Sequence, residues 1–170
     1  MIALQEVTPL SELTDPASIN EHVWECLQKT HVVEPHRPRP DLMTWRRGSA
    51  QLTIKVNPEL DNLSIYSVLV SGVAPTEELF RYLLAYNVLQ RRESLGMTEK
   101  DGKVYIILKY TMELEVVNDD SLQRHILAIQ EVADKLDTEL AEKFGGSLQF
   151  EDWERLNQEG VDDLLGGLFG

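Results

Sequence analysis

Residues 79–114, LFRYLLAYNVLQRRESLGMTEKDGKVYIILKYTMEL, decide the fold, and their first half predicts a helix. Thr76 supplies a side-chain N-cap just before it, and Glu77 and Glu78 place negative charge in the first turn, where the helix dipole favours it. The helix is apolar on more than one side. Its three stripes are Leu79, Leu83 and Tyr86, then Phe80, Leu84 and Asn87, then Tyr82, Ala85 and Leu89. A small sheet covers only one side of such a helix, so we expect a second subunit or another protein to cover the rest.

The second half of the stretch predicts an antiparallel hairpin. Residues 94–99 and 103–115 are two extended runs, and Asp101-Gly102 between them is a preferred turn dipeptide. Residues 104–108 are apolar throughout, which predicts a strand that is buried on both faces. Asn87 lies at the end of the preceding helix, and we expect its amide to tie that helix to the next strand rather than to bind a ligand.

Upstream of this stretch, the pattern predicts one helix and three strands. Asp15-Pro16 is an N-cap followed by proline at the first helical position, which starts a helix over residues 16–30. The segment HVVEPHRPRPD, residues 31–41, holds three prolines and predicts an extended connector. Alternation and tight turns then predict strands over residues 42–47, 50–58 and 63–72, the last of them apolar on both faces and therefore central.

Downstream, residues 118–121 offer several caps for a last long helix. One amphipathic stripe follows at alternating spacings of four and three, formed by Leu122, Ile126, Ile129, Ala133, Leu136 and Leu140. Gly145-Gly146 ends this helix, because glycine adopts a left-handed C-cap at little cost. The element order is thus α-β-β-β-α-β-β-α, which predicts an α+β fold with an antiparallel sheet.

We divide the chain into an N-terminal extension (residues 1–15), a single α+β domain (16–146) and an acidic-apolar C-terminal tail (147–170). The tail holds six acidic residues and one arginine, with large apolar residues between them. Its four glycines weaken any helix there. Such segments either pack onto their own domain or stay mobile and fold on a partner, and both alternatives stay open at this point.

The composition is that of one acidic globular domain. The chain has 170 residues, with 29 Asp and Glu against 16 Lys and Arg, and the net charge of −13 repels nucleic acid and anionic lipid. Its single cysteine, Cys26, rules out a disulfide framework, and no stretch approaches the length of an apolar membrane span. The first residues also lack the pattern of a signal peptide. We therefore expect a cytoplasmic protein with no membrane partner.

The sequence contains none of the common catalytic motifs. It has no dinucleotide or phosphate loop, no zinc-protease or serine-nucleophile motif and no calcium loop. Cys26 falls on the apolar face of its helix, where a thiol acts as a small hydrophobe. His31 and His36 lie in the proline-rich connector, where we expect solvation rather than metal binding. We therefore expect no enzymatic activity, no cofactor and no metal, and we assign no catalytic residue.

The densest positive region surrounds an aromatic residue and consists of Arg37, Arg39, Arg46 and Arg47 with Trp45. Basic residues interleaved with an aromatic bind single-stranded nucleic acid in some proteins. Because the whole chain is strongly acidic, we favour contact of this region with acidic protein surface, including the chain's own tail. A nucleic-acid-associated regulator is one alternative function, and an enzyme or small-molecule binder of an unrecognised type is another.

Residues 79–114, together with the helix that contains ILAIQEVADKLDTELAEKFGG (126–146), resemble the YbjN-like proteins, which share the fold of type III secretion chaperones. The matching positions are Asn87, Leu95-Gly96, the Asp101-Gly102 turn and Ala133-Asp134. The resemblance spans residues 16–146 and implies an α+β fold with an antiparallel sheet, frequent homodimers and no catalytic centre. The acidity and the tail are similar to a cyanobacterial or plastid branch. The tail and the HRPRP segment depart from the pattern.

We therefore interpret the chain as a non-enzymatic, protein-binding adaptor or chaperone-like factor that binds segments of a partner protein through apolar surface and forms a homodimer. The helix in residues 79–114 and the tail would supply that surface. The candidate protein-binding residues are Phe80, Tyr82, Leu84, Trp153, Leu164, Leu165, Leu168 and Phe169.

Overall fold

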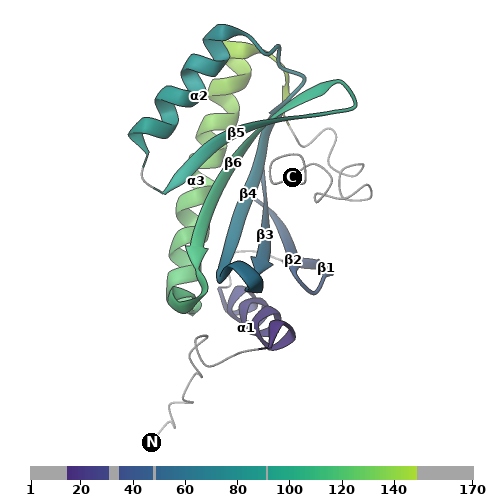
Figure 1. Ribbon diagram of the computed structural model, residues 1–170, viewed down its shortest axis with the longest axis vertical. Helices are drawn as coiled ribbons and strands as arrows, with labels where there is room; N and C mark the ends of the chain where they lie inside the picture. The colour runs from purple at the N-terminus through teal and green to yellow at the C-terminus, as the bar shows by residue number, and fades with distance from the viewer. Residues whose placement is uncertain (1–14, 31–34, 48, 91, 149–170) are drawn as a thin grey trace, which may run out of the picture.

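A computed structural model describes residues 15–30, 35–47, 49–90 and 92–148 and shows an antiparallel sheet with helices along it (Figure 1). The helices are α1 (Pro16–Lys29), α2 (Glu77–Leu89) and α3 (Asp119–Phe144), with two short 3-10 helices, η2 (Pro58–Leu60) and η3 (Leu114–Val116). The strands are β1 (His36–Arg39), β2 (Leu42–Arg47), β3 (Ala50–Asn57), β4 (Asn62–Ser71), β5 (Glu93–Lys100), β6 (Lys103–Glu113) and β7 (Ser147–Leu148). The predicted α+β class is confirmed.

The sheet has the strand order β1-β2-β3-β4-β6-β5, and the short β7 also pairs with β4. Every pair is antiparallel, and β4 is central as predicted, because it bonds to β3 on one side and to β6 on the other. Two strands were not predicted. The segment expected to be only an extended connector forms β1, which pairs His36 with Thr44, and β7 pairs Leu148 with Val70. The proline inside β1 is compatible with this edge position, because an edge strand leaves half of its N–H groups unpaired.

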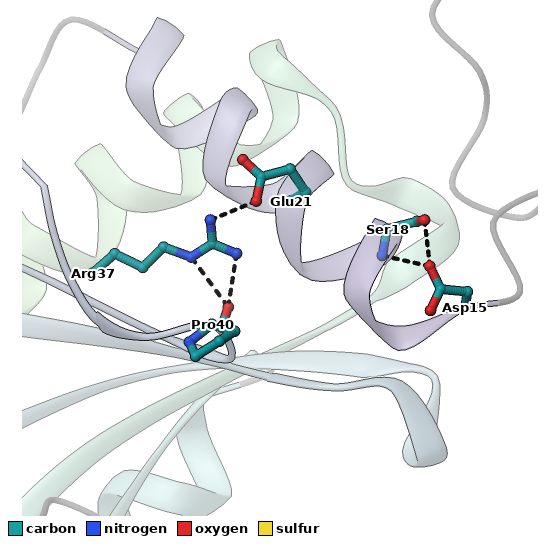
Figure 2. A network of polar contacts seen from close by, with 5 residues as sticks. All are labelled: Asp15, Ser18, Glu21, Arg37 and Pro40. Carbon is teal, nitrogen blue, oxygen red and sulfur yellow. Dashed lines mark hydrogen bonds and ion pairs between the residues drawn. The ribbon is translucent and has the colours of Figure 1, made fainter.

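The helix starts are capped as the sequence predicts. The Asp15 carboxylate accepts hydrogen bonds from the backbone N–H groups of Ala17 and Ser18. It also contacts the Ser18 hydroxyl, and Figure 2 shows its contacts with Ser18. Thr76 Oγ1 accepts from the N–H of Leu79 at 3.2 Å, which starts α2. At the start of α3, Asn118 and Ser121 bond reciprocally at 3.0 and 2.9 Å and complete a capping box.

The hydrophobic core lies between the helices and one face of the sheet. The predicted stripe of α3 is confirmed, because all six of its members are buried: Leu122, Ile126, Ile129, Ala133, Leu136 and Leu140. The stripe packs onto β3 and β4, along which α3 runs in Figure 1. α1 contributes Ile19, Val23, Cys26 and Leu27 to the same core and contacts α3. Both helices therefore cover the same side of the sheet.

The opposite side of the sheet, which we call the second face, carries a different set of side chains. Strand alternation and register place there, in the middle, Leu42, Thr44, Thr53, Tyr66, Val68, Tyr105 and Ile107, with Lys55, Lys103 and Lys109 around them. None of these residues belongs to the core cluster beneath the helices. The middle of the second face is nevertheless buried, as predicted for the residues within 104–108.

The hairpin turn and the end of α2 are also built as predicted. Asp101 and Gly102 have φ angles of 53° and 72°, the left-handed geometry that a two-residue hairpin turn requires. The Asn87 amide donates to the carbonyl oxygen of Leu95 at 2.9 Å and accepts from its N–H at 2.7 Å. Asn87 therefore ties the last turn of α2 to β5, which is the structural role that the sequence favoured.

Gln130 is a buried polar residue of α3 whose replacement should stabilise the fold. Its side chain is 5% exposed, and neither its Nε2 nor its Oε1 has a hydrogen-bond partner among the described residues. An unsatisfied buried amide costs free energy that an apolar side chain of similar size avoids. We expect Gln130→Leu to raise the free energy of unfolding by about 1 kcal/mol, measured by urea denaturation. Gln28→Leu, at an exposed position of α1, is the control and should leave it unchanged.

Candidate protein-binding surfaces

The inner sides of α2 are fixed by β5 and by α3. Leu79 and Leu83 are buried, and the Tyr82 hydroxyl donates to Glu139 Oε1 at 2.8 Å. The Tyr82 ring also meets Phe144 edge to face, with 5.4 Å between ring centroids. Tyr82, one of the candidate binding residues, therefore lies between α2 and α3, where it holds two helices of the same chain together.

The two tyrosines on these inner sides are held in their neutral form. Burial and the neighbouring Glu139 raise the pKa of Tyr82 well above its ordinary value. Burial, together with Glu93 and Glu139, raises the pKa of Tyr86 to about 12. Both phenols thus stay protonated throughout the neutral range. Such groups donate hydrogen bonds but supply no base or nucleophile.

The outer side of α2 exposes a row of large apolar side chains, which we call the α2 stripe. Its members are Phe80, Leu84, Val88 and Leu89, with exposures of 41%, 67%, 83% and 78%. Phe80, Leu84 and Val88 recur every four residues and so share one helix face. Only three other large hydrophobic side chains of the described residues are exposed, and they are scattered over other elements: Leu60, Val116 and Leu127. Clusters of exposed apolar side chains are typical of surfaces that contact another molecule.

The α2 stripe lies on the helix for which the sequence predicts cover from outside its own sheet, and that cover stays a prediction. Phe80 and Leu84 were among the candidate binding residues, whereas Val88 and Leu89 were not. The spacing from Phe80 through Leu84 to Val88 was the signal that would have found Val88. The remaining candidates lie outside the described residues and stay predictions: Trp153, Leu164, Leu165, Leu168 and Phe169.

Two members of the arginine region, Trp45 and Arg37, take part in the structure of the domain itself. Trp45, the aromatic residue expected to stack on bases, is only 2% exposed and belongs to the core. Arg37 bonds to Glu21 Oε2 at 2.6 Å and donates to the Pro40 carbonyl, so that it joins β1 to α1 (Figure 2). Its guanidinium also lies 5.5 Å from the centre of the Trp24 ring. This side chain therefore has a structural role inside the domain.

Cys26 is placed to be chemically inert. Its side chain is 1% exposed, and burial, with Asp119 adding to it, raises the pKa of the thiol to about 12. The reactive form of cysteine is the thiolate, so we expect the folded protein to resist alkylation by iodoacetamide at pH 8, whereas the urea-unfolded chain reacts fully. Mass spectrometry of both samples measures this. Equal rates in the two samples would contradict the buried position.

The raised pKa of Cys26 also fixes the sign of a pH dependence. Because the folded state favours the neutral thiol over the thiolate, the contribution of Cys26 to the free energy of unfolding is fully present below the ordinary pKa of 9.0. It is lost as the pH rises from there toward about 12. The contribution of Cys26 to the free energy of unfolding should therefore fall in alkali and stay constant near neutrality.

Within residues 15–30, 35–47, 49–90 and 92–148, no three His, Cys, Asp or Glu side chains come together as a metal ion would need. None of the helices in that part of the chain is long and apolar enough to cross a membrane.

Comparison with known proteins points to one family. The sequence model of TY-Chap1, described as "T3SS (YopN, CesT) and YbjN peptide-binding chaperone 1", matches residues 17–152. The crystal structure of YbjN from E. coli superposes with a TM-score of 0.57 at 9% identity, over 76% of this chain and 94% of that chain. The ExsC–ExsE complex gives a TM-score of 0.58 at 15% identity, over 73% of this chain and 95% of that chain. These structures share the fold. A sequence comparison with curated proteins gives no match.

Proposed function

Because the chain belongs to the T3SS and YbjN family of peptide-binding chaperones, we propose that it is a non-enzymatic adaptor that binds a segment of a partner protein through apolar surface. The observation that carries the proposal is the α2 stripe. We propose further that the protein acts in the cytoplasm, since its one cysteine is a free thiol and fits a reducing compartment.

The α2 stripe has the properties of a binding surface with an energetic centre. Leu84 and Val88 are mostly exposed, so a partner that covers them removes nearly whole side chains from water. Each such burial contributes about 1.5–3 kcal/mol. The Glu77–Arg81 ion pair, with 2.7 Å between the charged atoms, supplies a polar neighbour beside the stripe on the same helix. Apolar residues with a polar rim are the usual anatomy of a protein interface.

We include a homodimer in the proposal. A single exposed apolar row on one helix can pair with the same row of a second copy about a two-fold axis, because such an interface needs only one self-complementary patch. The stripe can then serve the dimer, the partner segment or both. The oligomeric state and the partner must therefore be measured in the same set of variants.

A matched pair of variants tests this surface. Leu84→Glu places a charge in the middle of the α2 stripe, at a leucine that is 67% exposed. Leu60→Glu places the same charge on η2, at a leucine that is 70% exposed. Each full-length variant is used as bait in the lysate of its source organism, captured proteins are quantified by mass spectrometry, and each bait is sized by light scattering. We expect Leu84→Glu to lower capture of the partner about tenfold or more, and Leu60→Glu to leave it unchanged.

The two readouts separate the roles of the stripe. A Leu84→Glu protein that becomes monomeric and loses its partner assigns the stripe to the dimer on which binding depends. A protein of unchanged size that loses its partner assigns the stripe to the partner itself. The proposal fails if the unaltered protein is monomeric and its captured proteins are the same as those of Leu84→Glu.

A further inference from the structure

The second face is buried although the core beneath the helices lies on the other side of the sheet. Tyr105 and Ile107 are each 1% exposed, Thr53 is 3% exposed and Tyr66 is 4% exposed. When helices cover one face of an antiparallel sheet, the other face usually carries polar side chains in contact with water. In this sheet the middle of the second face instead carries aromatic and aliphatic side chains, which are as buried as those on the helix side. A covering layer on this face is required to account for that burial.

Lysine side chains lie beside the buried middle of the second face. Lys109 Nζ lies 5.8 Å from the centre of the Tyr66 ring, and Lys103 Nζ lies 5.9 Å from that of Tyr105. Lys55 lies on the same face beside Ser64 and Leu42 in the register. Burial also lowers the pKa of Lys109. The covering layer should therefore be apolar in part, to meet the rings and Ile107, and acidic in part, to meet the lysines.

The chain itself leads toward this face. β7 pairs Ser147 with Ser71 and Leu148 with Val70, and Ser71 is in turn paired with Tyr105 of β6. The described chain therefore ends within the sheet, beside the last residues of β4 and across that strand from Tyr105. From there 22 residues remain to the end of the chain. Fully extended they span about 70 Å, whereas six strands about 4.8 Å apart are less than 30 Å wide, so the segment is long enough.

We propose that residues 149–170 fold back over the second face of their own sheet and form its covering layer. The segment has the chemistry that would complement this face, because acidic and large apolar residues are interspersed along it. The acidic residues are Glu151, Asp152, Glu154, Glu159, Asp162 and Asp163. The apolar residues are Phe150, Trp153, Leu156, Leu164, Leu165, Leu168 and Phe169. This contact lies on the opposite side of the sheet from the helices and does not depend on the proposed binding of a partner at α2.

A spin label in the segment tests the proposal in the full-length protein. Gln158→Cys provides the attachment site, and the unaltered chain, in which Cys26 is buried, shows how much label enters elsewhere. In the ¹⁵N-labelled protein we expect the amide signals of Tyr66, Tyr105 and Ile107 to be lost by paramagnetic broadening. Amides on the outer side of α3, such as those of Glu131 and Lys135, should keep their intensity. A mixture of ¹⁵N-labelled protein without spin label and spin-labelled unlabelled protein detects contact between copies.

Charge reversal in the same protein supplies the second measurement. Lys109→Glu should restore the signals of Tyr66 and Tyr105, because the negative charge at position 109 then repels the acidic segment. Lys135→Glu, on the exposed side of α3, should leave the broadening unchanged. The proposal is overturned if the broadening falls on α2 instead, if no described residue is affected, or if the second face is broadened only in the mixture, since a second copy would then be the covering layer.

Discussion

Gly146→Ala is expected to lower the free energy of unfolding by about 2–4 kcal/mol, measured by urea denaturation. A Cβ at this position would lie 2.6 Å from the carbonyl oxygen of Ser71 and 2.9 Å from Val73 Cγ1. The first of these atoms belongs to the backbone of the central strand β4 and cannot move aside cheaply. The φ angle of +94° adds strain, because L-residues rarely adopt it.

Gly145→Ala is the matched control. Gly145 has a φ of +74°, and a Cβ there would meet nothing within 4 Å. The substitution therefore carries the left-handed backbone cost, about 1 kcal/mol, without the collision. Equal losses of stability in the two variants would show that the close approach to Ser71 has no energetic weight.

The collision at Gly146 also bears on the covering layer proposed for the second face. The glycine directly precedes β7, whose pairing with β4 sets where the described chain ends. If Gly146→Ala separates β7 from β4, the start of the segment moves away from Tyr105. The spin-label broadening of Tyr66 and Tyr105 should then weaken in this variant, while Gly145→Ala should retain it.

Much of the fold could be predicted because it depends on local pattern. The stripe of α3, the Asp101-Gly102 turn and the caps at Asp15 and Thr76 are each set by residues a few positions apart. β1 and β7 could not be found in this way. β1 contains a proline and β7 has two residues, and both are strands only because β2 and β4 offer open hydrogen-bonding edges to them.

The binding surface could be predicted in kind but not in detail. The sequence showed that the helix now seen as α2 has more apolar sides than one sheet can cover. Which side stays open is decided by how the helix docks on β5 and α3, and no local pattern encodes this. Tyr82 follows Phe80 by two residues, or roughly 200° around the helix, so the two cannot share a face. Tyr82 accordingly packs toward Phe144 while Phe80 stays on the stripe.

Asn87→Ala is expected to lower the free energy of unfolding by about 2–3 kcal/mol. The substitution removes both hydrogen bonds to Leu95, and leaves the N–H and carbonyl groups of this residue without their partner. Leu95 is 4% exposed, so water replaces the lost bonds poorly. The loss should be visible in urea denaturation and in faster hydrogen exchange of the Leu95 amide.

Asn87→Asp separates the two halves of this contact. A carboxylate can still accept the hydrogen bond from the Leu95 N–H, which is 2.7 Å long in the unaltered protein. It cannot donate to the Leu95 carbonyl oxygen, and it repels that oxygen. We expect the Leu95 amide to stay protected from exchange in Asn87→Asp and to lose protection in Asn87→Ala, although both variants are less stable than the unaltered protein. Because this contact fixes the end of α2 on β5, its loss also frees Val88 and Leu89 from their present orientation. If Asn87→Ala captures the partner as well as the unaltered protein does, binding uses the Phe80 end of the stripe. If Asn87→Ala loses the partner and Asn87→Asp partly retains it, binding needs the whole stripe to be held in place.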